Sequence, residues 1–325
     1  MTFIAKSSII ILRNVKGAGD VKIYEYSESI KFGFSASVVA LGLFDGVHKG
    51  HKALLNSAKR EAEKRKLPLV VFTFFSENEL PKSTKRLYST DVKNELLEKA
   101  GADFVVLADF NKISNVSAES FVNDILIGKL SAELAVTGSD FRFGKGREGD
   151  KTLLSRIMSQ NFKECLFVSD EMLYGKKVST SYIKELLSEG KLSLANEFLG
   201  EAYFIEGKIV HGDGRGKSLG LPTVNIALQN RSNFIKKGVY YTEIDIGGKS
   251  YTGLTNIGVC PTFEAREVHA ETFILNFSDT VYGEVARIRL LDYVRDEQKF
   301  KNKEELTEQI EKDLSQVKKR WQNGR

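Results

Sequence analysis

Hydrophobic and polar positions follow different patterns in the two halves of this chain. In the first half, short apolar runs alternate with segments whose apolar residues recur every three or four positions. Such runs are typical of buried strands and such segments of helices. The pattern predicts strands at Lys22–Tyr26, at the run ending in Gly42, and at Leu69–Phe74, Phe104–Leu107, Leu134–Thr137 and Cys165–Val168. Strands that alternate with helices indicate a parallel sheet covered on both faces.

Residues that are typical of helix ends predict where the helices begin and end. A helical pattern begins at Lys49, and another helix is expected from about Asp91 to Ala100, ended by Gly101. Ser117 is a candidate N-cap for a helix that runs to about Leu130. A short connecting helix is expected at Leu192–Leu199, before Gly200.

The second half has a different texture. Residues 203–293 alternate or are rich in β-forming residues, and Gly247-Gly248 between two such runs is a hairpin signal. Further turns are expected at Gly212–Gly214 and Tyr282–Gly283. Short strands at this spacing predict an antiparallel barrel or sandwich. A final helix over Lys303–Trp321 carries an apolar stripe that we expect to pack on the barrel: Leu306, Ile310, Leu314, Val317 and Trp321.

Length and charge fit two ordinary globular domains. We place them at residues 1–187 and 188–325, since 325 residues can build two cores. The net charge of +5 is compatible with anionic small ligands and does not require nucleic acid. Two cysteines without metal-ligand spacing, and the lack of a long apolar run, predict a reduced, cytoplasmic protein that does not enter a membrane. We expect a monomer or a weak homo-oligomer.

The first candidate site lies at Val39–Leu55, where an apolar run ends at Gly42 and a helical pattern follows. The turn Phe44-Asp45-Gly46 precedes His48 and His51, which share a face of the first helical turn. A strand feeding a helix through such a turn leaves free backbone N–H groups and the positive end of the helix. This geometry suits a triphosphate, although the histidines also fit a capping or structural role.

Two further segments of the first half combine features of phosphate-binding loops. Glycine, basic and aromatic residues occur together in Gly138–Asp150, although a plain charged loop has a similar composition. Val178–Leu187 opens with three hydroxyl residues, which are either helix caps or ligands. The candidate residues of these segments are Gly138, Asp140, Phe141, Arg142, Phe143, Ser179, Thr180 and Lys184.

The second half has its own candidate site in Gly212–Asn225. Its glycines surround basic residues, which suits a flexible loop that covers phosphates: Gly214, Arg215, Lys217 and Gly220. Pro222-Thr223-Val224-Asn225 then places a hydroxyl and an amide oxygen on the same side of an extended chain. Both are hard oxygen ligands of the kind that Mg²⁺ accepts beside ATP, although a loop proline with a hydroxyl cap has the same sequence.

These motifs together resemble the bacterial bifunctional riboflavin kinase/FAD synthetase (FMN adenylyltransferase) family. FDGVHKGH is similar to the HxGH signature of the adenylyltransferase half, and GSDFRFGKGREGD to its DFxFGxxRxGD segment. GDGRGKSLGLPTVN resembles the GRxLGxPTAN motif of riboflavin kinases. Residues 255–263 match NxGxxPTF, and Glu271 in Ala-Glu-Thr-Phe matches a glutamate of the kinase family. Val281–Gly283 and Arg295–Phe300 match two further motifs of the kinase half. Five ordered matches over about ninety residues argue against coincidence.

The resemblance implies a Rossmann-like nucleotidyltransferase domain followed by a β-barrel kinase domain with a terminal helix. It implies that Glu271 is the general base of the kinase, that Thr223 and Asn225 hold Mg²⁺, and that Arg295 lies at the flavin. In the first half it implies that His48 and His51 are catalytic residues. It assigns ATP to ten residues: Gly42, Phe44, Asp45, Gly46, His48, His51, Gly138, Ser179, Thr180 and Lys184. FMN is assigned to Asp140–Phe143. ATP, riboflavin, FMN and FAD are then the substrates and products.

Three segments depart from the family pattern. The family's ISSTxIRxxL is VSTSYIKELL here, its TFDPHP is Thr73–Asn78, and its Asn before FDG is Leu43. All three lie in the first half, so two alternatives remain open. Beside the bifunctional enzyme that the resemblance implies, they are a protein that is chiefly a kinase with a weakened adenylyltransferase, and a flavin-binding regulator without either activity.

Overall fold

The computed structural model divides the chain into two compact units, Met1–Ser179 and Thr180–Arg325. It describes residues 21–75, 86–210, 223–228, 234–259, 268–298, 300 and 302–322. The division falls at 179/180, eight residues before the boundary expected from the sequence, and therefore assigns helix α6 (Thr180–Glu189) to the second unit.

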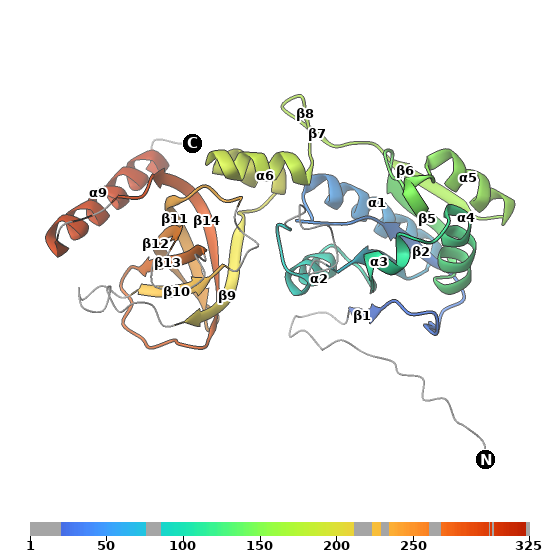
Figure 1. Ribbon diagram of the computed structural model, residues 1–325, viewed down its shortest axis with the longest axis horizontal. Helices are drawn as coiled ribbons and strands as arrows, with labels where there is room; N and C mark the ends of the chain where they lie inside the picture. The colour runs from blue at the N-terminus through green and yellow to red at the C-terminus, as the bar shows by residue number, and fades with distance from the viewer. Residues whose placement is uncertain are drawn as a thin grey trace, which may run out of the picture. The chain divides into compact units, whose positions relative to one another are not determined.

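A parallel sheet forms the centre of the first unit (Figure 1). Its strands lie side by side in the order β1-β4-β3-β2-β5-β6, and every neighbouring pair is parallel. The strands are β1 (Lys22–Glu25), β2 (Ser37–Leu41), β3 (Leu69–Phe74), β4 (Phe104–Ala108), β5 (Ala132–Gly138) and β6 (Glu164–Val168). The chain order reverses between β2 and β5, and open parallel sheets bind ligands at such a point, beyond the carboxyl ends of the strands.

Helices connect these strands, and capping side chains explain where several of them begin. Ser89 accepts the Val92 N–H at the start of α2, Ser117 accepts the Ser120 N–H at α4, and Asp150 accepts the Leu153 N–H at α5. The helices are α1 (Lys49–Arg65), α2 (Thr90–Lys99), α3 (Phe110–Ile113), α4 (Ala118–Ser120), the π-helix η1 (Phe121–Lys129), the short 3₁₀-helix η2 (Lys145–Arg147) and α5 (Lys151–Gln160). A small hairpin, β7 (Met172–Leu173) and β8 (Lys176–Lys177), follows.

The sheet is buried on both faces, as the apolar runs require. Alternate residues of the strands, such as Val39 and Val70, pack with residues of η1 and α5, such as Ile125 and Leu154. Their neighbours along the strands, such as Val38, are equally buried and face the other way, toward the side covered by α1. With both faces covered, a ligand is expected at the carboxyl ends of the strands, as in other open parallel sheets.

The second unit is a closed antiparallel barrel that follows two helices (Figure 1). The strands pair in the order β10-β13-β12-β11-β14-β9. They are β9 (Phe204–Val210), β10 (Thr223–Ala227), β11 (Gly238–Ile246), β12 (Lys249–Val259), β13 (Val268–Ile274) and β14 (Val285–Arg295). Besides α6, the unit contains α7 (Leu192–Leu199) and α9 (Lys303–Gln322), which lies against β14. Gly247 and Gly248 form the β11–β12 turn at φ 56° and 79°, angles that glycine adopts without strain.

Three threonines form a polar chain inside the barrel. Thr242, Thr255 and Thr272 come from the neighbouring strands β11, β12 and β13 and have no exposed surface. The Oγ1 atom of Thr255 lies 2.9 Å from that of Thr242 and 2.8 Å from that of Thr272. Because buried hydroxyls need partners, these contacts allow polar groups inside an otherwise apolar interior.

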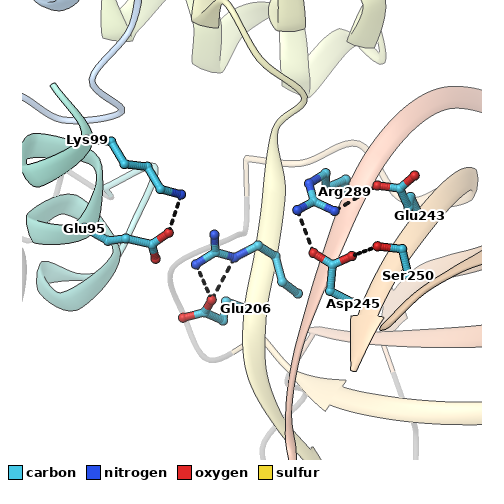
Figure 2. A network of polar contacts seen from close by, with 8 residues as sticks. Glu95, Lys99, Glu206, Glu243, Asp245, Ser250 and Arg289 are labelled. Atoms are coloured by element: carbon cyan, nitrogen blue, oxygen red, sulfur yellow. Dashed lines mark hydrogen bonds and ion pairs between the residues drawn. The ribbon is translucent and has the colours of Figure 1, made fainter. Parts of the chain in front are cut away.

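Ion pairs join strands on the outside of the barrel (Figure 2). Arg289 of β14 contacts Glu243 at 2.9 Å and Asp245 at 2.6 Å, and Asp245 also accepts the Ser250 hydroxyl. Arg287 donates to Glu206 of β9 at 2.8 Å. Side chains in register on adjacent strands are close enough for such pairs, which link β9, β14 and β11.

The expected fold class is confirmed: a parallel sheet with helices in the first unit, and an antiparallel barrel followed by a helix in the second. Each expected strand and helix is present, with ends that differ by a few residues. The sequence reasoning did not predict α3, α5 or the β7–β8 hairpin. The turn expected at Gly212–Gly214 lies outside the described residues, and so does the side chain of Trp321.

Candidate active sites

The turn after β2 holds its backbone in an unusual conformation. Phe44 and Val47 have φ values of 49° and 40° although neither is glycine, and Gly46 has a φ of 84°. Phe44 is completely buried, and its ring lies so close to Gly42 that a Cβ atom there would be 3.0 Å away. Packing of the Phe44 ring therefore enforces a turn that most residues avoid, as is common at functional sites.

This turn delivers His48 and His51 to the beginning of α1. His48 is the N-cap residue, and its Nδ1 accepts the backbone N–H of His51 at 3.3 Å. The two rings stack with centroids 3.6 Å apart and an angle of 14° between their planes. The paired imidazoles thus lie at the positive end of a long helix, beyond the carboxyl end of β2.

Burial keeps both imidazoles uncharged. Desolvation lowers the pKa of His48 to about 4, and the charges of Lys52 and Lys177 act in the same direction. Desolvation also lowers the pKa of His51, with smaller contributions from His48 and Lys93. Since His48 Nδ1 accepts a hydrogen bond, its proton is on Nε2, where it can be donated to an anion. Nδ1 of His51 is buried and has no hydrogen-bond partner among the described residues.

Lysines around the histidines were not identified from the sequence. Lys93 of α2 is 2% exposed and donates to the carbonyl of Phe74, the last residue of β3. Lys177 contacts Asp140 at 2.6 Å and Asp170 at 2.9 Å. The charge of Lys177 contributes to the lowered pKa of His48, and that of Lys93 to the lowered pKa of His51. Neither lysine stands in a motif, so only the fold brings it to this end of the sheet.

Asp45, expected to bind ATP, fixes a neighbouring segment in this structure. It is buried, its Oδ1 accepts the backbone N–H of Leu87 at 2.8 Å, and its Oδ2 lies 3.9 Å from Arg86. These contacts attach the residues that precede α2 to the histidine turn.

The expected FMN-binding loop starts where β5 ends, at Gly138, next to the end of β2. Asp140 and Arg142 are at its surface, in ion pairs with Lys177 and Asp150 respectively. The pKa of Asp140 is lowered, chiefly by the hydrogen bond from Lys177. Phe141 stacks on Phe143 with centroids 5.6 Å apart.

Phe143 is buried and belongs to the core of the unit, where it also contacts Phe121. In this structure, then, Phe143 anchors the loop, Phe141 is partly buried against the same core, and Asp140 and Arg142 remain exposed.

The hydroxyl-rich segment falls at the division between the units. Ser179 is the last residue of the first unit, while Thr180 and Lys184 lie on α6 of the second. The ammonium group of Lys184 lies 5.8 Å from the centre of the Phe234 ring.

In the second unit, strand pairing brings three expected site residues together. Asn225 of β10 is directly opposite Glu271 of β13, and Thr223 is opposite Phe273, two residues further along. Val224 and Thr272 are buried inside the barrel, so Thr223, Asn225 and Glu271 face outward on the same side of the two strands. A hydroxyl and an amide side chain thus lie beside a carboxylate.

The same transverse row continues across the barrel. Glu271 pairs with Asn256 of β12, Asn256 with Val239 of β11, and Val239 with Arg295 of β14. Arg295 lies at the end of this row, where it forms an ion pair of 2.9 Å with Asp313 of α9. Asp313 is only 1% exposed.

Five residues of the second candidate site lie outside the described residues: Gly214, Arg215, Lys217, Gly220 and Pro222. Among the residues that the structure does describe, no three His, Cys, Asp or Glu side chains gather as a metal site. No helix within those ranges is both long and apolar enough to span a lipid bilayer.

Comparison with known proteins finds a different family for each of the two parts of the chain. The family described as FAD synthetase matches residues 33–182, and the family described as riboflavin kinase matches residues 199–321. The bifunctional riboflavin kinase/FMN adenylyltransferase of Bacillus subtilis is 35% identical over 301 residues, which cover 89% of this chain and 94% of the relative. This chain belongs to the bifunctional riboflavin kinase/FMN adenylyltransferase family.

Other relatives cover nearly the same length. The family member of Escherichia coli K12 is 33% identical over 285 residues, or 85% of this chain and 90% of the relative. A crystal structure from Streptococcus pneumoniae, titled a macrolide-efflux protein, aligns with a TM-score of 0.82 and 28% identity. It covers 90% of this chain and 97% of that one.

Family membership gives each site a context. The paired histidines lie in the part that matches FAD synthetase, and the row from Asn225 to Arg295 lies in the part that matches riboflavin kinase. The roles of individual residues stay predictions. Asp45, Phe143 and Arg295 also make contacts within the protein. A ligand-binding role for any of them has to be compatible with these contacts.

Proposed function

We propose that the chain is a bifunctional enzyme that phosphorylates riboflavin to FMN and then adenylylates FMN to FAD. The observation that carries the proposal is the pairing of each family match with a matching arrangement of side chains. The first unit presents paired neutral imidazoles at a helix start. The second presents a carboxylate beside two neutral oxygen ligands.

In the kinase reaction, Glu271 removes the proton from the ribityl 5′-hydroxyl of riboflavin, this oxygen attacks the γ-phosphate of ATP, and ADP leaves. Thr223 and Asn225 fit Mg²⁺, because they offer a hydroxyl and an amide oxygen from the same face of β10, next to Glu271. Bound there, Mg²⁺ would neutralise phosphate charge, which is a large part of what phosphoryl-transfer enzymes supply. Arg295 is proposed to lie at the flavin end.

In the adenylylation reaction, a phosphate oxygen of FMN attacks the α-phosphate of ATP, and pyrophosphate leaves. The Nε2–H of His48, the imidazole of His51 and the start of α1 stabilise the negative charge that develops on the triphosphate. Lys93 and Lys177 add positive charge nearby. Ser179, Thr180 and Lys184 are proposed to bind the same triphosphate. No covalent intermediate with the protein is needed.

The proposal is tested by supplying riboflavin and Mg-ATP to the purified protein and separating the flavins by chromatography. We expect riboflavin to be converted to FMN and then to FAD. Accumulation of FMN without FAD would favour the alternative in which the adenylyltransferase half is weakened. Flavin binding without any conversion would favour the regulator instead.

Three further expectations belong to this proposal. We propose that the enzyme acts in the cytoplasm, as a monomer or weak homo-oligomer, and without nucleic acid. The mild net charge of +5 supports a preference for small anionic ligands.

A further inference from the structure

Asn256 lies beside the proposed general base on the side opposite Asn225. It is in register with Glu271, one strand away, and therefore projects from the same face of the barrel. Glu271 thus has an amide side chain on each flank, Asn225 from β10 and Asn256 from β12. Asn225 is proposed to bind the metal, whereas the proposed function assigns no role to Asn256.

The two ends of the Asn256 amide have different surroundings. Nδ2 donates to Oε1 of Glu297 at 3.2 Å, and since a carboxylate only accepts hydrogen bonds, this contact fixes which end of the amide is which. Oδ1 is buried and has no hydrogen-bond partner among the described residues. A buried acceptor without a donor is costly, so it is expected to meet one in the working enzyme.

The carboxylate of Glu297 lies against β12 at Gly258. A side chain at Gly258, two residues after Asn256, would collide with the Glu297 carboxylate. Gly258 thus leaves the space that Glu297 occupies, and Glu297 orients the amide of Asn256.

We infer that Asn256 binds a hydroxyl group of the substrate's polyhydroxyl chain through Oδ1, and that Glu297 is the positioning residue that keeps Oδ1 available. This inference rests on the proposed kinase function, because the proposed base Glu271 acts on the terminal hydroxyl of such a chain. Asn256 contributes to selection of a substrate that carries further hydroxyls beside the reacting one.

The test measures kinase kcat and KM, together with riboflavin affinity from the quenching of flavin fluorescence in the presence of Mg-ADP. Asn256→Ala should raise the KM and Kd for riboflavin about tenfold, the loss of roughly one hydrogen bond, and leave the KM for ATP unchanged. Gln298→Ala, an exposed change in the same segment as Glu297, is the matched control and should alter neither.

Riboflavin analogues that each lack one non-reacting hydroxyl supply the decisive readout. The unmodified enzyme should bind one analogue about tenfold more weakly than riboflavin, and Asn256→Ala should bind that analogue and riboflavin equally. Glu297→Ala and Gly258→Ala should raise the Kd for riboflavin in the same direction. Adding Glu297→Ala to Asn256→Ala should have no further effect, since Glu297 acts through the amide.

Two results would overturn the inference. One is an unchanged riboflavin Kd in Asn256→Ala. The other is that Asn256→Ala discriminates among the analogues in the same way as the unmodified enzyme. Failure of the proposed function looks different: the unmodified protein would then not phosphorylate riboflavin, while the fluorescence titrations would still measure whether Asn256 contributes to binding.

Discussion

At the scale of single residues, the first unit depends on histidines that stay uncharged. His48 has a pKa of about 4 in the folded protein against about 6.5 in an unfolded chain, so the unfolded state binds the proton first as the pH falls. Folding is therefore favoured above pH 6.5, and this contribution is lost as the pH falls toward 4. His51 acts in the same direction.

This linkage predicts that the first unit loses about 2 kcal/mol of unfolding free energy between pH 7 and pH 5 through His48 alone. Urea titrations of the enzyme and of His48→Asn at both pH values measure the effect. Asparagine is a good N-cap, so this variant keeps the start of α1 and removes only the titrating ring. An equal loss in both proteins would contradict the prediction.

His48→Asn should also lower FMN adenylylation at least a hundredfold and leave riboflavin phosphorylation intact, because the Nε2–H donor is removed while the helix cap remains. Conversion of FMN to FAD and of riboflavin to FMN, assayed separately, measures both halves. Loss of both activities would mean that the substitution disturbs folding instead of a single site.

Glu271→Ala should have the reverse effect. Removal of a general base costs about 10²- to 10⁴-fold, so FMN formation should nearly stop while added FMN is still converted to FAD. Glu271→Gln preserves the shape of the side chain and should be as inactive as Glu271→Ala. Normal kinase turnover in either variant would show that Glu271 is not the base.

At the scale of secondary-structure elements, helix α9 is joined to β14 by an ion pair of Arg295, the residue proposed to lie at the flavin. Arg295 contacts Asp313 through Nε, and Gln309 donates to the same carboxylate at 2.7 Å. A carboxylate this deeply buried requires its partner.

We therefore expect Arg295→Met to destabilise the second unit by about 3–5 kcal/mol, because Asp313 would be left buried and uncompensated. The double variant Arg295→Met/Asp313→Leu should recover most of this loss. Thermal unfolding followed by circular dichroism measures both variants. If instead Arg295→Met unfolds normally and only weakens flavin binding, the guanidinium is chiefly a ligand group.

The elements themselves were largely predictable from local patterns. Ser117 and Gly101 mark helix ends through capping and left-handed conformation, and the Gly247-Gly248 pair marks a hairpin, all properties of a few adjacent residues. Helix α5 was missed because Asp150, its N-cap, was interpreted as part of a phosphate loop.

The candidate site residues were predictable only in part, because local patterns report only on residues that are close along the chain. Motifs identified His48, His51, Thr223, Asn225 and Glu271, which are consecutive in short segments or match a family signature. Lys93 reaches its place through packing between distant segments, which no local pattern encodes. Asn256 stands in the NxGxxPTF match, but its place beside Glu271 follows from strand pairing. The contacts that Asp45 and Phe143 make within the protein were likewise not predictable from local patterns.

At the scale of the whole molecule, the two proposed reactions share only a diffusible intermediate. We expect FMN to leave the kinase site as a free product before it enters the other site, so the two sites need not belong to the same chain. An equimolar mixture of Glu271→Gln and His48→Asn should therefore produce FAD from riboflavin and Mg-ATP, although neither variant does so alone.

Chromatography of the flavins formed by the mixture checks this expectation. FMN should first rise and then fall as FAD appears. If FMN accumulates in the mixture while Glu271→Gln still converts added FMN, transfer within one chain is required.

The three threonines inside the barrel have a consequence for how related sequences can vary. Thr255 is the middle residue of this hydrogen-bonded chain, so its change to valine removes a partner from two buried hydroxyl groups. A change of Thr242 or Thr272 removes only one contact. Replacing all three with apolar residues of the same shape would be nearly neutral. Among related proteins, these positions on β11, β12 and β13 should therefore be exchanged as a set, and Thr255 should almost never change first.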